Sequence, residues 1–428
     1  MGYIKKKINV QDLEVGMRIA DLDRPWLETP MLFQGDVIHS QSEIDELKRY
    51  CNYVYITVSQ SGEAIARRVG AVIHGDTTTQ AAAEPQRLEF DLLKKAAMPQ
   101  YGDHRYPDQT TLEQEVKTVR RTHHEARMFI KTLLEDARAR KSLDMMAAKR
   151  IVGDLTDSIL RNHDALMCFC QLKNKHEFTA EHSLRVCVLA LTLGRHLGLE
   201  REALHHLGTG ALLHDIGKVK VPGDLLEKSG ALAPHDVEIM RYHVQLGVSM
   251  LRQLPDISPQ AVEAVREHHE RYDGSGYPDG LKANAIGLFG QITGLADHYD
   301  TMTSDWADHS AVSGYIAIRK LYELRNKEFH HELLEKFIQC MGVYPIGTLV
   351  ELNTGEVGVV VTMNRLRRLR PRVVLVLGPS NTAYEELKII SMMHESASDG
   401  RTLEIERAIA PGTYGIDPQH YLSAAVGS

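Results

Sequence analysis

Residues 212–218 read Leu-Leu-His-Asp-Ile-Gly-Lys, and this stretch is the main indication of the fold. It is an apolar run that carries His214 beside Asp215, ends its turn at Gly217 and continues into Lys218. Neighbouring helix residues project about 100° apart, so a shared role for His214 and Asp215 requires a group between them. A metal ion is such a group, because imidazole nitrogens and carboxylate oxygens both bind divalent metals. Lys218 adds a mobile positive charge of the kind that binds phosphate.

Further histidines and carboxylates accompany this pair, and they distinguish it from an isolated His-Asp dipeptide such as His235-Asp236. They are His182, His243, the doublet His268-His269, Asp297 and Asp300. The doublet leads directly into a glycine-rich loop that ends at Tyr277-Pro278. Five imidazoles and two carboxylates exceed the ordinary coordination number of one ion. The imidazoles are those of residues 182, 214, 243, 268 and 269, and the carboxylates are those of 215 and 297. The set therefore predicts two ions, with Asp215 as the bridge.

The order and spacing of these motifs resemble the HD-GYP family, a bacterial branch of the HD superfamily of metal-dependent phosphohydrolases. The matching motifs are HDIGK at 214–218, HHERYDGSGYP at 268–278 and DHYD at 297–300. The resemblance extends from near Phe178 to near Leu334 and implies a mainly α fold, with an all-helical HD-type bundle as the catalytic core. Gly16-Met17 and the Leu-Asp-Arg-Pro-Trp run at 22–26 resemble the small domain that often precedes such bundles.

The resemblance also implies how the ligands divide between the two ions. One ion would be held by His182, His214, Asp215 and Asp297, and the other by Asp215, His243, His268 and His269. A mixed nitrogen and oxygen set without cysteine favours iron, manganese, zinc, cobalt or nickel over magnesium or calcium, and the resemblance favours iron or manganese. Some relatives hold a third ion through a Glu four residues before the first His; Phe178 stands there, so we expect two ions. Asp300 is expected to orient a ligand histidine or a loop amide.

The implied reaction is hydrolysis of cyclic di-GMP to pGpG, either ending there or continuing to GMP, in bacterial signalling such as biofilm and motility control. A hydroxide bridging the ions would attack phosphorus. Asp215 and Lys218 are the expected catalytic residues, with Lys218 also neutralising phosphate oxygens. The resemblance assigns the glycine-rich loop to the bound dinucleotide or to a GGDEF-type partner protein, through Gly274, Gly276, Tyr277 and Pro278. The alternative for this loop is that it only closes a helix pair.

One departure from the family concerns the substrate. Where the family usually carries an Arg-Pro-Tyr-Arg run, residues 306–309 read Trp-Ala-Asp-His. The phosphate-binding Arg is missing, so Lys218, Arg271 or Arg319 would have to replace it. A slow or inactive protein that acts as a cyclic di-GMP receptor or partner-binding module is therefore the alternative function. Hydrolysis of a different nucleotide is the third.

Composition limits the class of protein. A chain of 428 residues predicts two or three domains, and a formal net charge of −7 argues against a partner that is a nucleic-acid polymer. The five cysteines form no CxxC array, which favours a reducing compartment. No apolar run is long enough to span a membrane, and residues 1–5 lack the apolar core of a signal peptide. We therefore expect a cytoplasmic protein.

The pattern of the chain predicts five segments. They are an N-terminal α+β module over 1–60, a linker over 61–110, a long connecting helix over 111–145, the catalytic domain over 146–342 and a C-terminal β-rich segment over 343–428. A helix at 42–51 and a strand at 53–58 are expected in the first segment. In the last, strands at 348–352 and 357–362 flank the turn at 353–355, followed by strands at 372–377 and 402–406.

The long helix has two interpretations. Its apolar or small residues recur at intervals of four and three, which is typical of a coiled-coil seam. They are Leu112, Val116, Val119, Ala126, Ile130, Leu133 and Ala137. One interpretation is a homodimer helix that carries a signal from the N-terminal module. The other is a helix docked on its own catalytic domain.

Overall fold

The computed structural model describes the chain in several ranges. These are residues 3–17, 19–23, 38, 41–59, 102, 104–172, 178–226, 228, 230, 233–305, 310–364, 369–393, 400 and 402–425. The chain divides into two compact units, Met1–Lys95 and Ala96–Ser428, and each is described by itself. Trp26, most of the predicted linker and the run at 306–309 lie outside the described residues, as does the side chain of Phe178.

The first unit contains a three-stranded antiparallel sheet and one helix. The strands are β1 (Tyr3–Asn9), β2 (Ile19–Leu22) and β3 (Tyr53–Ser59), in the order β1-β3-β2. Val54 and Ile56 of β3 are buried, as are Ile44 and Leu47 of helix α1 (Gln41–Tyr50). The alternation in the strand and the spacing in the helix explain this common core. The expected helix and strand of this module are confirmed within one residue at each end.

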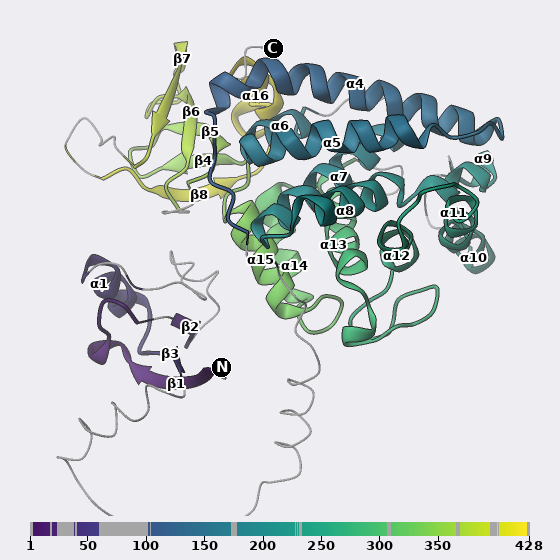
Figure 1. Ribbon diagram of the computed structural model, residues 1–428. Helices are drawn as coiled ribbons and strands as arrows, with labels where there is room; N and C mark the ends of the chain where they lie inside the picture. The colour runs from purple at the N-terminus through teal and green to yellow at the C-terminus, as the bar shows by residue number, and fades with distance from the viewer. Residues whose placement is uncertain are drawn as a thin grey trace, which may run out of the picture. The chain divides into compact units, whose positions relative to one another are not determined.

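The second unit is a helical bundle followed by a sheet (Figure 1). Its helices before the sheet are α4 (Leu112–Arg138), α5 (Met145–Arg161), α6 (His163–Cys170), α7 (Phe178–His196), α8 (Arg201–Leu213), η4 (Ile216–Lys220), α9 (Gly223–Leu226), α10 (Pro234–Arg241), α11 (His243–Leu251), α12 (Pro259–Glu267), η5 (Ala283–Ala285), α13 (Leu288–Thr303), α14 (Gly314–Glu323) and α15 (His331–Met341). The expected mainly α fold is therefore confirmed. Within the described ranges, no helix combines the length and hydropathy needed to cross a bilayer.

Helix α7 lies at the centre of the bundle. Every residue from Glu181 to Arg195 is buried, and α7 packs against α8, α13, α4, α5, α6 and α15. Helix α8 packs in turn on α12, which contacts α11 and α13. A helix buried on all sides must be apolar nearly all round, and its charged residues need partners inside the protein. The charged residues of α7 therefore mark positions where the bundle contains polar contacts.

Helix α4 runs along α5 and covers the bundle (Figure 1). Val119, Ala126 and Ile130 of its predicted seam are almost fully buried, and α4 packs on α5, α6 and α7 of the same chain. Near its start Glu115 is buried and pairs with Arg161 of α5, Oε1 to Nη2 at 2.6 Å. The apolar side of α4 is thus covered as the docked-helix interpretation expects.

The C-terminal sheet has five antiparallel strands in the order β7-β6-β5-β4-β8. They are β4 (Leu349–Leu352), β5 (Val357–Thr362), β6 (Arg372–Leu377), β7 (Ala383–Ser391) and β8 (Ile405–Ile409), and helix α16 (Pro418–Ala425) follows. The β4–β5 hairpin and β6 agree with expectation. The expected strand at 402–406 is found as β8, displaced toward the C-terminus, at one edge of the sheet.

Strand β7 and helix α16 are not expected from the sequence. Tyr384 and Leu387 of β7 are exposed, because an edge strand needs little apolar surface and so carries a weak pattern. The sheet belongs to the same compact unit as the helices, and Cys168 of α6 donates to the carbonyl of Val361 in β5. The boundary at 342/343 stays a prediction.

Candidate metal centre

The seven predicted ligands come from five parts of the bundle and converge on one place. His182 lies on α7, His214 and Asp215 follow α8, His243 begins α11, His268 and His269 follow α12, and Asp297 lies on α13. Two groups have potential ligand atoms within 4.8 Å of one another: Asp215 with His243, His268 and His269, and Asp215 with His182 and His214. Asp297 borders the second group, its Oδ1 3.1 Å from His182 Nε2. Their role as ligands stays a prediction, but their proximity is a property of the fold.

Asp215 stands between the two groups. Its Oδ1 lies 3.2 Å from His243 Nε2 and 3.8 Å from His268 Nε2. Its Oδ2 lies 3.4 Å from His214 Nε2 and 3.7 Å from His182 Nε2. Each carboxylate oxygen thus faces a different pair of imidazoles, which is the arrangement that a bridging ligand requires.

The backbone fixes how three of these imidazoles are oriented. In each, Nδ1 donates to the carbonyl three residues earlier: His214 to Ala211 at 2.8 Å, His243 to Met240 at 2.6 Å and His268 to Val265 at 2.8 Å. A carbonyl oxygen can only accept, so Nδ1 carries the proton. With Nδ1 occupied by that proton, only Nε2, the atom that faces Asp215, can offer a lone pair to a metal.

The donor set fits a pair of divalent cations. His214 is fully buried, and its Nε2 has no hydrogen-bond partner among the described residues. Burial alone would raise the pKa of Asp215, but the positive charge of Lys218 holds it well below its usual value. Burial would likewise raise the pKa of Asp297, but His182, whose Nε2 lies 3.1 Å from Oδ1, holds it well below its usual value. Two buried carboxylates among imidazoles that present nitrogen lone pairs are chemistry suited to a transition metal.

Asp300 contacts the Nδ1 side of His182, and Arg185 in turn contacts Asp300. Asp300 Oδ2 lies 2.7 Å from His182 Nδ1, in line with the orienting role expected of Asp300. Arg185 binds the same carboxylate, with Nε 2.6 Å from Oδ1 and Nη2 3.0 Å from Oδ2. Arg185 is not among the residues expected from the sequence. Its available signal was the spacing of three residues from His182 on one helix, which puts both side chains on the same face.

Lys218, predicted to bind phosphate, also contacts the predicted bridging residue Asp215. Its Nζ is 2.5 Å from Asp215 Oδ2, and its side chain is 20% exposed. The spacing of three residues and the turn formed by η4 bring the two groups together. Lys218 therefore presents its charge at the rim of the centre.

The predicted loop residues have two kinds of position. The ring of Tyr277 stacks on His269, with centroids 4.6 Å apart, and so borders the cluster directly. Gly274 has a φ of +81°. A Cβ on Gly276 would lie 2.4 Å from the backbone oxygen of His269, too close for any side chain. These glycines thus shape the loop that carries Tyr277.

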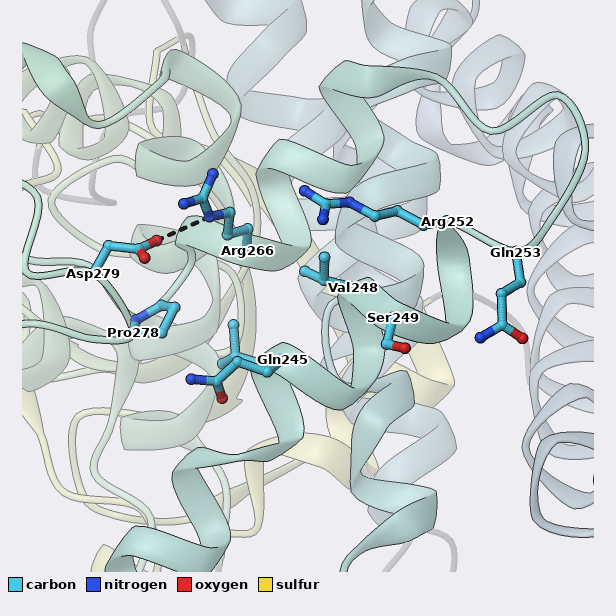
Figure 2. Close-up of a pocket in the computed structure, with 9 residues that line it drawn as sticks. Gln245, Val248, Ser249, Arg252, Gln253, Arg266, Pro278 and Asp279 are labelled. Carbon is cyan, nitrogen blue, oxygen red and sulfur yellow. Dashed lines mark hydrogen bonds and ion pairs between the residues drawn. The ribbon is translucent and has the colours of Figure 1, made fainter.

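Pro278 lines a separate cavity of about 580 Å³ (Figure 2). The cavity lies along one side of α11, and its other lining residues are Val244, Gln245, Val248, Ser249, Arg252, Gln253, Arg266 and Asp279. Arg266 and Asp279 face each other across one end, Nε to Oδ2 at 2.8 Å. The loop therefore presents Tyr277 to the metal centre and Pro278 to this cavity.

Comparison with known proteins agrees with the geometry. Residues 168–333 match a family model described as the HD domain, and residues 5–148 match a domain of unknown function, DUF3391. The cyclic di-GMP phosphodiesterase PA4108 of Pseudomonas aeruginosa is 31% identical over 370 residues, 86% of this chain and 84% of that protein. The chain belongs to the HD-GYP family.

Two further relatives each match 162 residues of this HD-GYP protein. A cyclic di-GMP phosphodiesterase of Thermotoga maritima is 35% identical over 162 residues, 38% of this chain and 44% of that protein. A 3′3′-cGAMP-specific phosphodiesterase of Vibrio cholerae is 30% identical over 162 residues, 38% of this chain and 31% of that protein. The names of these relatives thus specify two different substrates, cyclic di-GMP and 3′3′-cGAMP.

Proposed function

We propose that this HD-GYP protein is a metal-dependent phosphodiesterase that hydrolyses cyclic di-GMP to pGpG, and that the reaction either ends there or continues to GMP. The observation that carries the proposal is Asp215, whose two oxygens face two different pairs of imidazole nitrogens. The similarity to a protein named as a cyclic di-GMP phosphodiesterase over 84% of its length supports the choice of substrate.

The residues of the centre have different roles in the proposed reaction. Two divalent ions held by the seven predicted ligands would polarise a phosphoryl oxygen and lower the pKa of water. Asp215 holds the two halves of the centre together, and Asp297 adds a second buried carboxylate beside His182. Lys218 offers a cation at the rim for the non-bridging phosphate oxygens, because its side chain keeps an exposed fraction of 20%. Tyr277 stacks on His269 and limits how that imidazole turns.

The test is turnover by the full chain, purified without oxygen and loaded with Mn²⁺ or Fe²⁺. Cyclic di-GMP, 3′3′-cGAMP and pGpG are incubated separately, and the products are separated by chromatography. The expected result is pGpG from cyclic di-GMP, with 3′3′-cGAMP cleaved more slowly. Faster cleavage of 3′3′-cGAMP would overturn the assignment of substrate, and no cleavage of either by a fully metallated sample would overturn the assignment of activity.

A receptor is the second candidate, because the run at 306–309 lacks the phosphate-binding arginines usual in the family. This run lies outside the described residues. A receptor binds cyclic di-GMP without releasing product, so calorimetry on the same metallated sample separates the two functions. Binding with no product after many hours would favour the receptor.

Several narrower predictions accompany the proposal. Iron or manganese as the resident metal, a GGDEF-type partner, a homodimer and a cytoplasmic location stay predictions. Elemental analysis of anaerobically purified protein tests the first. Sedimentation at micromolar concentration tests the third, since a monomer there would contradict it.

A further inference from the structure

Arg185 is a charged residue at the centre of the bundle. It lies on α7, is 5% exposed and is separated by one helical turn from His182. A buried guanidinium destabilises the folded state unless its donors are satisfied, as any buried ion does. Its contacts therefore indicate what this arginine does.

Those contacts are directed at Asp300. Two guanidinium nitrogens bind the two carboxylate oxygens, at 2.6 and 3.0 Å, as a planar fork. Nη2 also donates to Ser304 Oγ at 3.2 Å, and Nη1 lies 3.5 Å from Glu181 Oε2. A two-point bond of this kind fixes the plane of a carboxylate as well as its position, which a single bond from a lysine cannot do.

The orientation of Asp300 matters because of what it does for His182. His214, His243 and His268 each donate Nδ1–H to a helical backbone carbonyl three residues earlier in the chain. His182 instead donates to a side chain, Asp300 Oδ2 at 2.7 Å, which comes from α13. A helix holds its carbonyls still, whereas a carboxylate can rotate about its side-chain bonds. Of the four imidazoles, His182 is therefore the one whose direction depends on a second side chain being held.

We propose that Arg185 is a positioning residue of the metal centre: it holds Asp300 so that His182 Nε2 points at Asp215 and Asp297. The metal-binding part of this inference stands on the contacts, and its effect on turnover rests on the proposed function. Loosening the fork should let His182 turn and weaken the ion on its side of Asp215, while the ion among His243, His268 and His269 is spared.

A purely structural role is the competing explanation, and α7 offers a matched control. Arg195 lies on the same helix, is 4% exposed, and donates Nη2 to the carbonyl of Tyr106 at 2.7 Å and to Asp108 Oδ1 at 2.8 Å. None of these groups is a predicted ligand. Arg195→Lys therefore reports the cost of shortening a buried arginine without touching the metal centre.

The experiment compares wild type, Arg185→Lys and Arg195→Lys in the full chain. Mn²⁺ affinity is measured by competition with a chelator, and the unfolding midpoint is measured with EDTA. We expect Arg185→Lys to bind one of two ions about 10- to 100-fold more weakly, as for other groups that orient metal ligands, and the other ion within threefold of wild type. kcat should fall while KM for cyclic di-GMP stays within threefold. Arg195→Lys should lose comparable stability and keep both affinities.

A second variant decides the matter if Arg185→Lys does not fold. The double variant Arg185→Met with Asp300→Asn removes both charges and leaves an amide oxygen as acceptor for His182. Glu181, which also contacts Arg185, keeps its ion pair with Arg127, Oε1 to Nη1 at 3.5 Å. We expect it to fold and still to bind one ion weakly, because the amide has lost its anchor.

Wild-type affinity for both ions in Arg185→Lys, or in the double variant, would overturn the inference. These results are independent of the substrate assignment. If the wild type binds two ions but cleaves no dinucleotide, the proposed function fails, while the affinities of the Arg185 variants still test the positioning role.

Discussion

At the residue scale, the centre depends on how one carboxylate is shared. Asp215 is 2% exposed and lies within 3.8 Å of four imidazole nitrogens, two at each oxygen. A terminal ligand belongs to one ion, but a carboxylate in this position contributes to both. Removing it should therefore affect the two halves together.

We predict that Asp215→Ala lowers the metal content from two ions per chain to none and lowers turnover by at least about 10³-fold. Elemental analysis and the cyclic di-GMP assay measure the two effects. Asp236→Ala is the control, because it changes a His-Asp pair outside the cluster, in which Asp236 binds Lys228 at 2.6 Å. Two retained ions in Asp215→Ala would show that Asp215 is not the bridge.

Lys218→Ala should separate rate from metal binding. We expect kcat/KM to fall by about 10²-fold, the usual cost of losing one group that stabilises developing charge, while both ions stay bound. Lys218→Arg keeps the charge and should lose less. A loss of metal in Lys218→Ala would mean that the contact with Asp215 Oδ2 serves the ligand rather than the substrate.

His123 on α4 provides a test by pH. Burial, helped by the charges of Arg127 and Arg185, lowers the pKa of His123 to about 4, whereas the unfolded chain titrates near its ordinary value of about 6.5. Below pH 6.5 the unfolded state therefore binds the proton first, and stability is lost as pH falls toward 4.

His123→Leu should consequently lose less stability than the wild type between pH 7 and pH 5, by about 1–2 kcal/mol. Urea unfolding with EDTA at both pH values measures the difference. Parallel losses in the two proteins would contradict the assigned pKa.

At the element scale, α4 has a seam with coiled-coil spacing, and the helices of its own bundle cover that seam. Ile130 is 1% exposed in the packing of α4 on its own bundle, whereas Met128 on the same helix is 44% exposed. A helix docked in this way is stabilised mostly by the packing of its buried side chains.

We predict that Ile130→Ala lowers the free energy of unfolding by about 3 kcal/mol, while Met128→Ala changes it by less than about 0.5 kcal/mol. Chemical denaturation of both variants at several protein concentrations is the measurement. If the loss in Ile130→Ala depended on concentration, the seam would be stabilised by a second chain instead.

At the scale of the whole molecule, the predicted ligands join distant parts of one unit. They come from α7, the turn after α8, α11, the turn after α12, and α13. Ions bound there favour the folded state by mass action, because the unfolded chain does not assemble the site.

Removal of metal should therefore destabilise the helical unit. With free Mn²⁺ at 1,000 times its dissociation constant, the stabilisation is about 4 kcal/mol relative to EDTA. Thermal unfolding under the two conditions measures it, and Asp215→Ala should show no such difference. Equal midpoints for the wild type in Mn²⁺ and EDTA would contradict binding at this site.

The class of fold and the candidate ligands could be predicted from the sequence. The seven predicted ligands follow from residue type, from spacing and from the resemblance to the family, because imidazole nitrogens and carboxylate oxygens both bind divalent metals. They are His182, His214, Asp215, His243, His268, His269 and Asp297. Helical periodicity likewise predicted α1 and α4, and the turn at 353–355 predicted the β4–β5 hairpin, since both patterns are local.

Tertiary structure alone decided the features that depend on contacts between distant segments. The seam of α4 has the same spacing whether it meets a second chain or its own bundle, so only packing identified its neighbours. Strand β7 carries a weak pattern because it pairs on one side at a sheet edge. The bond between Arg185 and Asp300 joins residues 115 positions apart. Sequence spacing cannot reveal that bond, because the crossing of α7 and α13 brings the two side chains together.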